Sequence, residues 1–231
     1  MANILVLCIA FYFGGIDDFI YPVILKDEKN MVLVDCGFTG SLPMLENAMQ
    51  EKGISVSQLT HILITHHDHD HIGSLYELKQ KYPNIKIISS IIEEPYISGK
   101  IKSFRLEQTE SLLNILPKEQ KPIIEKYYSI LKSVKPVNVD LTVNDGDKFD
   151  CCGGFTIIAT PGHTPGHISL FLDKENVFIA GDACVINNDN MIIVNPQQVF
   201  NVELAQRSLD KIKIFGTKKI ICYHSGVYDC E

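Results

Sequence analysis

The chain has 231 residues, of which 45% are hydrophobic and 21% are charged, so it is long enough to bury a sizeable core in one compact globular unit. Its formal net charge is −7, and its 21 lysines and arginines are scattered along the sequence. This argues against a nucleic-acid partner, because such proteins gather basic residues on one face.

Seven cysteines without any CxxC spacing argue against a disulfide framework and a thiolate zinc knuckle, and are typical of a protein kept in a reducing cytosol. The apolar opening NILVLCIAFYFGG resembles a signal peptide in hydropathy, but it lacks a basic start and is too short to cross a bilayer. We therefore predict a buried first strand, no membrane partner and a cytoplasmic location.

Apolar, β-rich runs then alternate with helical patterns. YPVILK and MVLVD are typical of strands, SLPMLENAMQEKG of a helix that ends at Gly53, and THILIT of a buried strand. A helix is predicted at GSLYELKQKY, with Leu75, Leu78 and Tyr82 on one face, and IKIIS is typical of another strand.

Residues 99–135 have a different character. LEQTESLLNILP and PIIEKYYSILKSV predict two amphipathic helices, broken by Pro117 and Pro122. This helical insert is a lid, a dimer contact or only packing, and we favour packing or a lid. Strand patterns resume in DKFDCCGGFTIIATPGHTPGHISLFLD and ENVFIAGDA, before a helix at VELAQRSLDKIKIFG and a last strand at KIICYH. No linker rich in Pro, Gly or Ser divides the chain, so we predict a single domain over residues 1–231 with mixed α and β structure.

The stretch THHDHDHIGS follows the predicted strand THILIT and places four histidines and two aspartates in the six positions from His66 to His71. Three further polar side chains also end predicted strands: His163, Asp182 and His224. Imidazole and carboxylate together suit zinc, iron or manganese. On an extended loop, residues two apart project to the same side, so one loop can serve two ions that share a hydroxide, as in two-metal hydrolysis.

THHDHDHIG, TPGHTPGH, FIAGDA and YHSG, in this order, resemble the metallo-β-lactamase superfamily, whose signature is H-x-H-x-D-H followed by a distal His, an Asp and a last His. The resemblance extends from VLVDCG, at Asp35, to His224. It implies an α+β fold: a four-layer αβ/βα sandwich of two mixed β-sheets flanked by helices, with the site at one edge. The joint occurrence of four ordered motifs makes the resemblance specific.

The register of the signature decides which residues between His66 and His71 occupy ligand positions. A signature that starts at His66 has one mismatch, Asp68 in place of His, whereas one that starts at His67 has two, including Ile72 at a ligand position. We therefore choose the first register. The resemblance then implies a first ion held by His66, Asp68 and His163, a second ion held by Asp70, His71 and His224, and Asp182 as a bridge between both.

The resemblance also assigns roles around the ligands. Asp70 has a catalytic role as well, orienting or accepting a proton from the water nucleophile. Asp35 is expected to fix a histidine tautomer. His67 and His69 become flanking residues beside the ions or at the surface, and His167 is expected to be a structural, hydrogen-bonding histidine.

Asp68 departs from the usual signature. A carboxylate in place of imidazole makes the first position harder and more negative, which favours iron or manganese relative to zinc. Flavodiiron proteins also carry a carboxylate at this position, but they depend on a flavodoxin module for which this chain lacks the length. We therefore expect two divalent ions, with zinc first and iron or manganese as the alternatives.

The resemblance implies a hydrolase in which a metal-bridging hydroxide cleaves a small-molecule ester, thioester or lactone. Glyoxalase II carries a C-terminal glutathione-binding domain, whereas the sequence ends seven residues after His224. Acyl-homoserine lactone lactonases carry Tyr where Val185 stands, and members that process RNA or DNA carry a larger insert. An iron-dependent oxygenase or redox enzyme and a non-catalytic, metal-binding regulatory protein are the alternative functions, and a homo-oligomer is left open.

Overall fold

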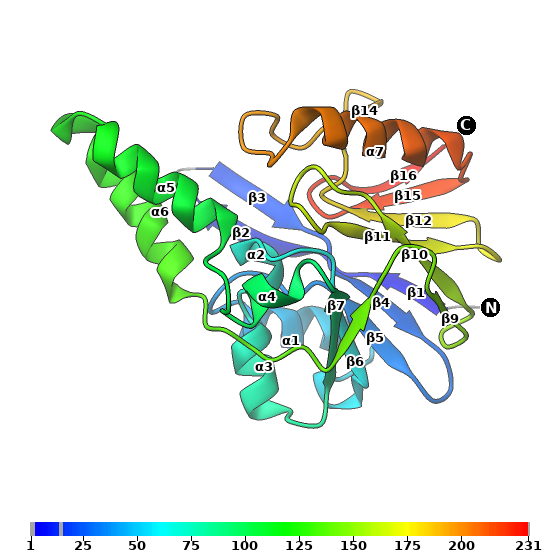
Figure 1. Cartoon of the computed structure of the whole chain (residues 1–231). Coiled ribbons are helices and arrows are strands. Elements are labelled where there is room, and N and C mark those ends of the chain that lie inside the picture. The colour runs from blue at the N-terminus through cyan, green and yellow to red at the C-terminus, as the bar shows by residue number, and fades with distance from the viewer. Residues whose placement is uncertain (1–2, 14–15, 231) are drawn as a thin grey trace.

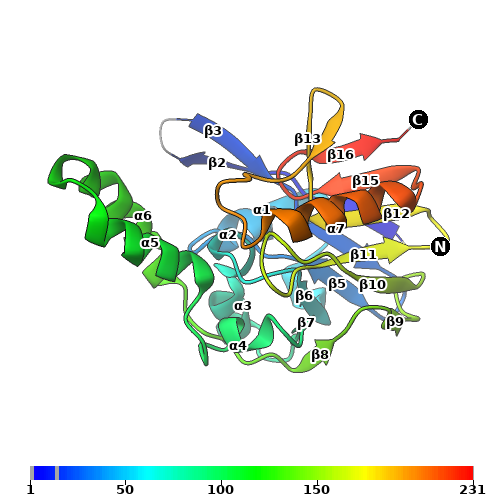
Figure 2. The same cartoon turned by 45° about the horizontal axis from the view of Figure 1, so that its top comes forward.

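The computed structural model describes residues 3–13 and 16–230. Two six-stranded sheets pack face to face, and helices cover their outer faces (Figures 1 and 2). The first sheet has the strand order β1 (Asn3–Val6), β4 (Val23–Lys26), β5 (Met31–Val34), β6 (His61–Ile64), β7 (Lys86–Ser90) and β8 (Leu141–Val143). Its strands β5 to β8 run parallel, and β1, β4 and β5 pair antiparallel, so this sheet is mixed.

The second sheet has the order β16 (Gly226–Asp229), β15 (Lys219–Cys222), β12 (Val177–Gly181), β11 (Ile168–Leu172), β10 (Phe155–Ala159) and β9 (Lys148–Phe149). Only β12 and β15 pair in parallel; the other neighbours in this sheet are antiparallel. Parallel pairing places the carboxyl ends of β12 and β15 at the same edge, next to those of β5 and β6 (Figure 1).

Alternation of side chains divides the core into layers. On β6, Leu63 packs between the sheets while Ile62 and Ile64 face the helices on the other side. On β12, Ile179 packs between the sheets while Phe178 faces a helix. A strand buried on both faces needs apolar residues at every position, which explains the continuous apolar runs. The predicted four-layer sandwich is confirmed.

Helices cover the two outer faces. Helix α1 (Leu42–Glu51) and helix α3 (Leu75–Lys81) pack on the first sheet, and α7 (Val202–Ile214) packs on the second (Figure 2). Outside the helical insert, the described residues also form short helical segments: η1 (Val56–Gln58), α2 (His69–Ile72) and α4 (Glu94–Ile97). The predicted end of α1 is correct, because Gly53 follows it in the left-handed region at φ 72°.

The predicted single buried strand at the N-terminus is wrong. The segment forms two strands, β1 and β2 (Ile9–Phe13), and β2 pairs with β3 (Ile16–Ile20) in a separate hairpin. Ile9 is buried, but Tyr12 is 72% exposed. A two-stranded hairpin has one face turned to solvent, so an apolar run there does not imply burial on both faces. The glycines Gly14 and Gly15 lie outside the described residues.

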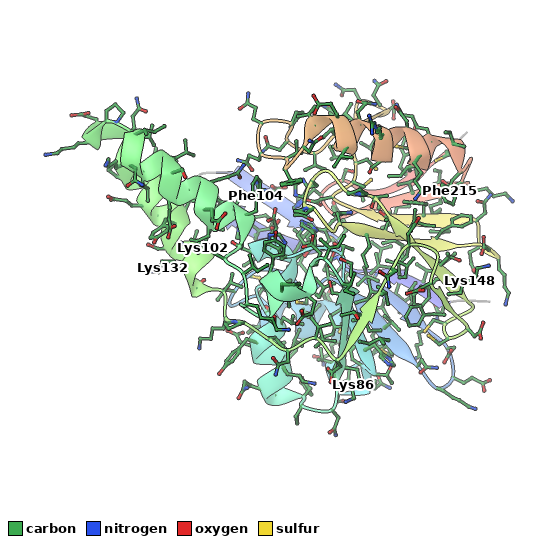
Figure 3. The ribbon with its side chains drawn as sticks, in the orientation of Figure 1. Lys86, Lys102, Phe104, Lys132, Lys148 and Phe215 are labelled. Atoms are coloured by element: carbon green, nitrogen blue, oxygen red, sulfur yellow. The ribbon has the colours of Figure 1, made fainter. Side chains whose placement is uncertain are left out.

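The helical insert consists of α5 (Phe104–Ile115), η2 (Lys118–Gln120) and α6 (Lys121–Ser133). The two long helices form a hairpin that extends away from the sandwich (Figure 1), with Lys102 and Phe104 at its base (Figure 3). The amphipathic pattern predicted for α5 is wrong, because its buried residues are Arg105 and Thr109 while Ile115 is 78% exposed. Packing against a core therefore does not account for the outer half of the insert. No helix among the described residues is long and apolar enough to cross a membrane.

Candidate metal centre

Four separate stretches of chain bring polar side chains to one edge of the sandwich. The signature loop begins where β6 ends with a bend at Thr65, continues without regular structure to Asp68, whose backbone is extended, and then turns into α2. His163 lies in the turn between β10 and β11, Asp182 follows β12, and His224 follows the neighbouring parallel strand β15. The extended loop that we expected thus ends at Asp68, and Asp70 lies in the first turn of a helix.

The predicted first position brings together His66, Asp68 and His163, all buried. Asp68 Oδ2 lies 3.1 Å from His163 Nε2 and 3.8 Å from His66 Nε2. The three side chains can therefore offer ligand atoms to a single ion.

The predicted second position brings together Asp70, His71 and His224. Asp70 Oδ2 lies 3.3 Å from His224 Nε2 and 3.9 Å from His71 Nε2. This half of the centre is closer to solvent, because the side chains of Asp70 and His224 are 21% and 22% exposed.

Asp182 lies between the two positions. Its Oδ2 is 3.5 Å from His163 Nε2, 3.5 Å from His71 Nε2 and 3.3 Å from His224 Nε2. It also forms a third group of possible ligands with His66 and His71. The structure thus brings all seven predicted ligands into one connected cluster around this carboxylate.

The spacing and the surroundings of these atoms fit divalent ions. Ligands about 2.0–2.2 Å from a tetrahedral zinc lie about 3.3–3.6 Å apart, and the contacts of Asp182 are 3.3–3.5 Å long. Among the described residues, the buried Nε2 atoms of His66 and His71 and Oδ1 of Asp182 have no hydrogen-bond partner. Such a buried orphan costs about 1–3 kcal/mol, a cost that a bound ion would remove.

Asp35 fixes the orientation of two of these imidazoles. Its Oδ2 accepts hydrogen bonds from His71 Nδ1 at 2.8 Å and from the Thr65 hydroxyl at 2.7 Å. The Thr65 hydroxyl oxygen in turn accepts from His66 Nδ1 at 3.0 Å. Both Nε2 atoms are thereby left free to face the centre, which is the role expected of Asp35.

His167 supports the centre from behind. Its Nε2 accepts from the Asp182 backbone N–H at 3.0 Å, and its Nδ1 donates to the Thr160 hydroxyl at 2.8 Å. Burial and the nearby His163 lower the pKa of His167 to about 3, so the ring is neutral, as this pair of hydrogen bonds requires. This is the structural role that we expected of His167.

The two flanking histidines differ. His69 is partly exposed, with Nδ1 3.4 Å from Asp70 Oδ1. His67 is buried, which excludes the surface location, and its Nδ1 donates to the buried carboxylate of Glu93. Glu93 also accepts from the Thr164 hydroxyl and the Gly166 N–H. It therefore ties the signature loop to the turn that carries His163.

Sequence reasoning missed Glu93 and Arg105. Arg105 comes from the insert helix α5, is 5% exposed, and donates from Nη2 to Asp68 Oδ2 at 2.7 Å. Neither residue belongs to a motif. The available signal was indirect: a buried histidine and a buried aspartate both need charged or hydrogen-bonding partners.

Burial and charge shift the pKa values of two histidines, one from each half of the centre, in opposite directions. Burial acts to lower the pKa of His224, but Asp182 and Asp70 outweigh it and raise this pKa to about 10. Burial, together with the neighbouring imidazoles, lowers the pKa of His66 well below its usual value. The His224 half therefore carries a proton at neutral pH that a bound cation would displace.

Known proteins resemble this chain in sequence. A family model described as the metallo-beta-lactamase superfamily matches residues 16–224. The probable metallo-hydrolase YflN of Bacillus subtilis is 30% identical over 167 residues, covering 72% of this chain and 60% of YflN. A hydroxyacylglutathione hydrolase of Photobacterium profundum is 27% identical over 212 residues, covering 90% of this chain and 62% of that protein. The chain thus spans 60–62% of the length of these two relatives.

Solved structures resemble it in fold. A metallo-beta-lactamase family protein from Thermus thermophilus superposes with a TM-score of 0.74 at 22% identity, covering 98% of this chain and 74% of that one. An archaeal metallo-beta-lactamase superfamily protein from Sulfolobus tokodaii gives a TM-score of 0.70 at 21% identity, covering 99% and 82%. With the family match over residues 16–224, the chain belongs to the metallo-beta-lactamase superfamily.

Proposed function

We propose that the seven clustered side chains hold two divalent ions and that the protein is a hydrolase of a small-molecule thioester, ester or lactone. Relatives named as a probable metallo-hydrolase and as hydroxyacylglutathione hydrolases support metal-dependent hydrolysis. Hydroxyacylglutathione is a thioester, which makes thioesters the first substrate class to test.

The position of Asp182 carries the proposal. One carboxylate oxygen lies 3.3–3.5 Å from three imidazoles that belong to both predicted positions. Asp182 would therefore be placed to help hold both ions, and the histidines on either side would be among their further ligands.

When bound, the ions would lower the pKa of a water molecule and polarise the scissile carbonyl. The chain's own groups would orient the reactants. Asp70, at the partly exposed side of the centre, can accept a proton from the attacking water, because it and His224 are the most exposed of the candidate ligands. The buried Asp35, Thr65 and His167 hold the inner imidazoles and Asp182 in fixed orientations, so little reorganisation is needed during the reaction.

Elemental analysis of protein purified without added metal tests the proposal, followed by assays of the same sample on thioester, lactone and phosphodiester substrates. We expect two ions per chain and turnover of a thioester or a lactone. Zinc is the first expectation, and iron or manganese would agree with the harder donor at Asp68. Iron with oxygen consumption on a thiol or persulfide substrate would instead support a redox enzyme, and bound metal without turnover would support a regulatory protein.

Substitution of Asp182 tests the role of the metal centre separately from the integrity of the fold. Asp182→Asn and Asp182→Ala should each lower metal content and reduce turnover at least about 100-fold, because the bridging ligand is lost. Asp210→Asn, at an exposed position of α7, is the matched control and should keep both. Full activity in a folded Asp182→Ala protein would contradict the proposal.

A further inference from the structure

Arg105 reaches from the insert into the centre. Its side chain is buried, Nη2 donates to Asp68 Oδ2 at 2.7 Å, and Nη1 donates to the backbone carbonyl of Gln198. Gln108, one turn along α5, accepts from Nη1 at 3.3 Å. The guanidinium is therefore held in place by partners from three parts of the chain.

Arg105 uses the same oxygen atom that an ion would use. Asp68 Oδ2 is the atom that lies 3.1 Å from His163 Nε2 and 3.8 Å from His66 Nε2. A carboxylate oxygen has two lone pairs and can serve both partners. A hydrogen bond from a guanidinium withdraws electron density from that oxygen, and its positive charge repels a nearby cation.

Among the described residues, no arginine or lysine is in direct contact with the carboxylates of the second position, and Arg105 acts on Asp70 only at longer range. Within the part of the chain that the structure describes, the ion pairs of Asp70 and Asp182 involve only histidines. A histidine can lose its proton when an ion binds, whereas arginine keeps its charge at any pH that a protein tolerates. The two positions therefore differ in a way that the ligand types alone do not show.

We propose that Arg105 is a positioning residue that competes with the ion for Asp68 and so limits the ion affinity of the first position. Without an ion, Arg105 neutralises Asp68 and keeps its side chain oriented toward His66 and His163. The inference rests on the proposed metal centre. It also gives the insert a role in the centre, since α5 supplies the competing cation.

Zinc titration against a chromophoric chelator tests this competition, in a His224→Ala background that retains His66, Asp68, His163 and Asp182. Arg105→Gln keeps hydrogen-bond donors but removes the charge, so it should bind zinc at least about tenfold more tightly than the background protein. Arg105→Lys keeps the charge and should stay within about threefold of it. Equal binding by Arg105→Gln would show that Arg105 does not compete with the ion, and weaker binding would show that it supports the ion; either result overturns the inference.

A second measurement uses the unaltered chain and does not depend on the folding of a variant. If zinc and Arg105 compete for Asp68 Oδ2, zinc loading should move the guanidinium ¹⁵N resonance of Arg105 and speed exchange of its Nη protons. If the protein binds two zinc ions and the resonance does not change, this inference is wrong but the proposed function stands. A chain that binds no zinc overturns the proposed function as well.

Discussion

Replacement of Asp35 by asparagine tests how the centre is supported. Asp35 is 1% exposed and accepts from the Thr65 N–H at 2.8 Å through Oδ1, and from the Thr65 hydroxyl and His71 Nδ1 through Oδ2. Asparagine keeps the size of the side chain but has one acceptor oxygen and one donor group. Each carboxylate oxygen of Asp35 faces at least one donor, so the NH₂ group of the introduced asparagine must face one as well.

Both orientations of the new amide have a cost. If the NH₂ group faces the Thr65 N–H, two donors oppose each other and a buried donor is orphaned, at about 1–3 kcal/mol. If it faces His71, Nδ1 can accept only when the proton moves to Nε2, the atom that lies 3.5 Å from Asp182 Oδ2. His71 could then no longer bind an ion, so we expect zinc affinity to fall about 10- to 100-fold.

Zinc competition and thermal unfolding, measured on the same samples, check this expectation. Asp140→Asn is the control, because Asp140 also accepts a backbone N–H, from Ile87 at 2.9 Å, but lies near the surface and away from the centre. The control should keep its zinc affinity. Unchanged zinc affinity in a folded Asp35→Asn protein would refute the argument that Asp35 sets the tautomer of His71.

Three further changes probe other supports. Glu93→Gln should destabilise the fold by about 3 kcal/mol in chemical denaturation, because it breaks the buried pair with His67; a loss below about 1 kcal/mol would contradict this role. Gly181→Ala should lower the melting temperature and metal content, since its φ is 55° and a Cβ atom would lie 2.9 Å from His167 Nε2; wild-type values for both would contradict it. Asp182 and Asp70 outweigh burial and raise the pKa of His224 to about 10 in the metal-free protein, and Asp182 and Asp35 likewise outweigh burial and raise that of His71. Zinc must therefore displace at least one proton at pH 7, so apparent affinity should rise at least about tenfold per pH unit. Calorimetry in buffers of different ionisation enthalpy should detect at least one released proton, and no release would contradict the assignment.

Local sequence patterns predicted the parts of the fold that depend on burial. Runs such as THILIT become strands with core on both faces, and the polar residues that follow them meet at one edge because β5 and β6 run parallel. For the same reason, Asp182 and His224 end parallel neighbours and lie close together. The grouping of the seven candidate ligands therefore needed only strand assignments, the order of the motifs and the resemblance to a known family.

Patterns failed where an apolar residue does not face the core. The hairpin of β2 and β3 exposes Tyr12, and α5 exposes Ile115 while it buries Arg105. Amphipathic analysis assumes that the apolar face of a helix is its inner face. At α5 the inner face meets the carboxylate of Asp68, so the polar side of the helix is buried and the assumption does not hold.

The position of Arg105 shows what one sequence can and cannot supply. Asp68 places a carboxylate among buried ligands, and a buried negative charge requires a partner, so the departure of Asp68 from the signature was already a reason to expect a compensating cation. The choice among 21 lysines and arginines depends on how the insert meets the sandwich, a non-local contact between residues 68 and 105. Local patterns do not encode that contact. A compensating change at both positions, such as Asp68→His with Arg105→Gln, should therefore lower the stability of the fold less than Asp68→His alone. The single change leaves the buried guanidinium without its carboxylate.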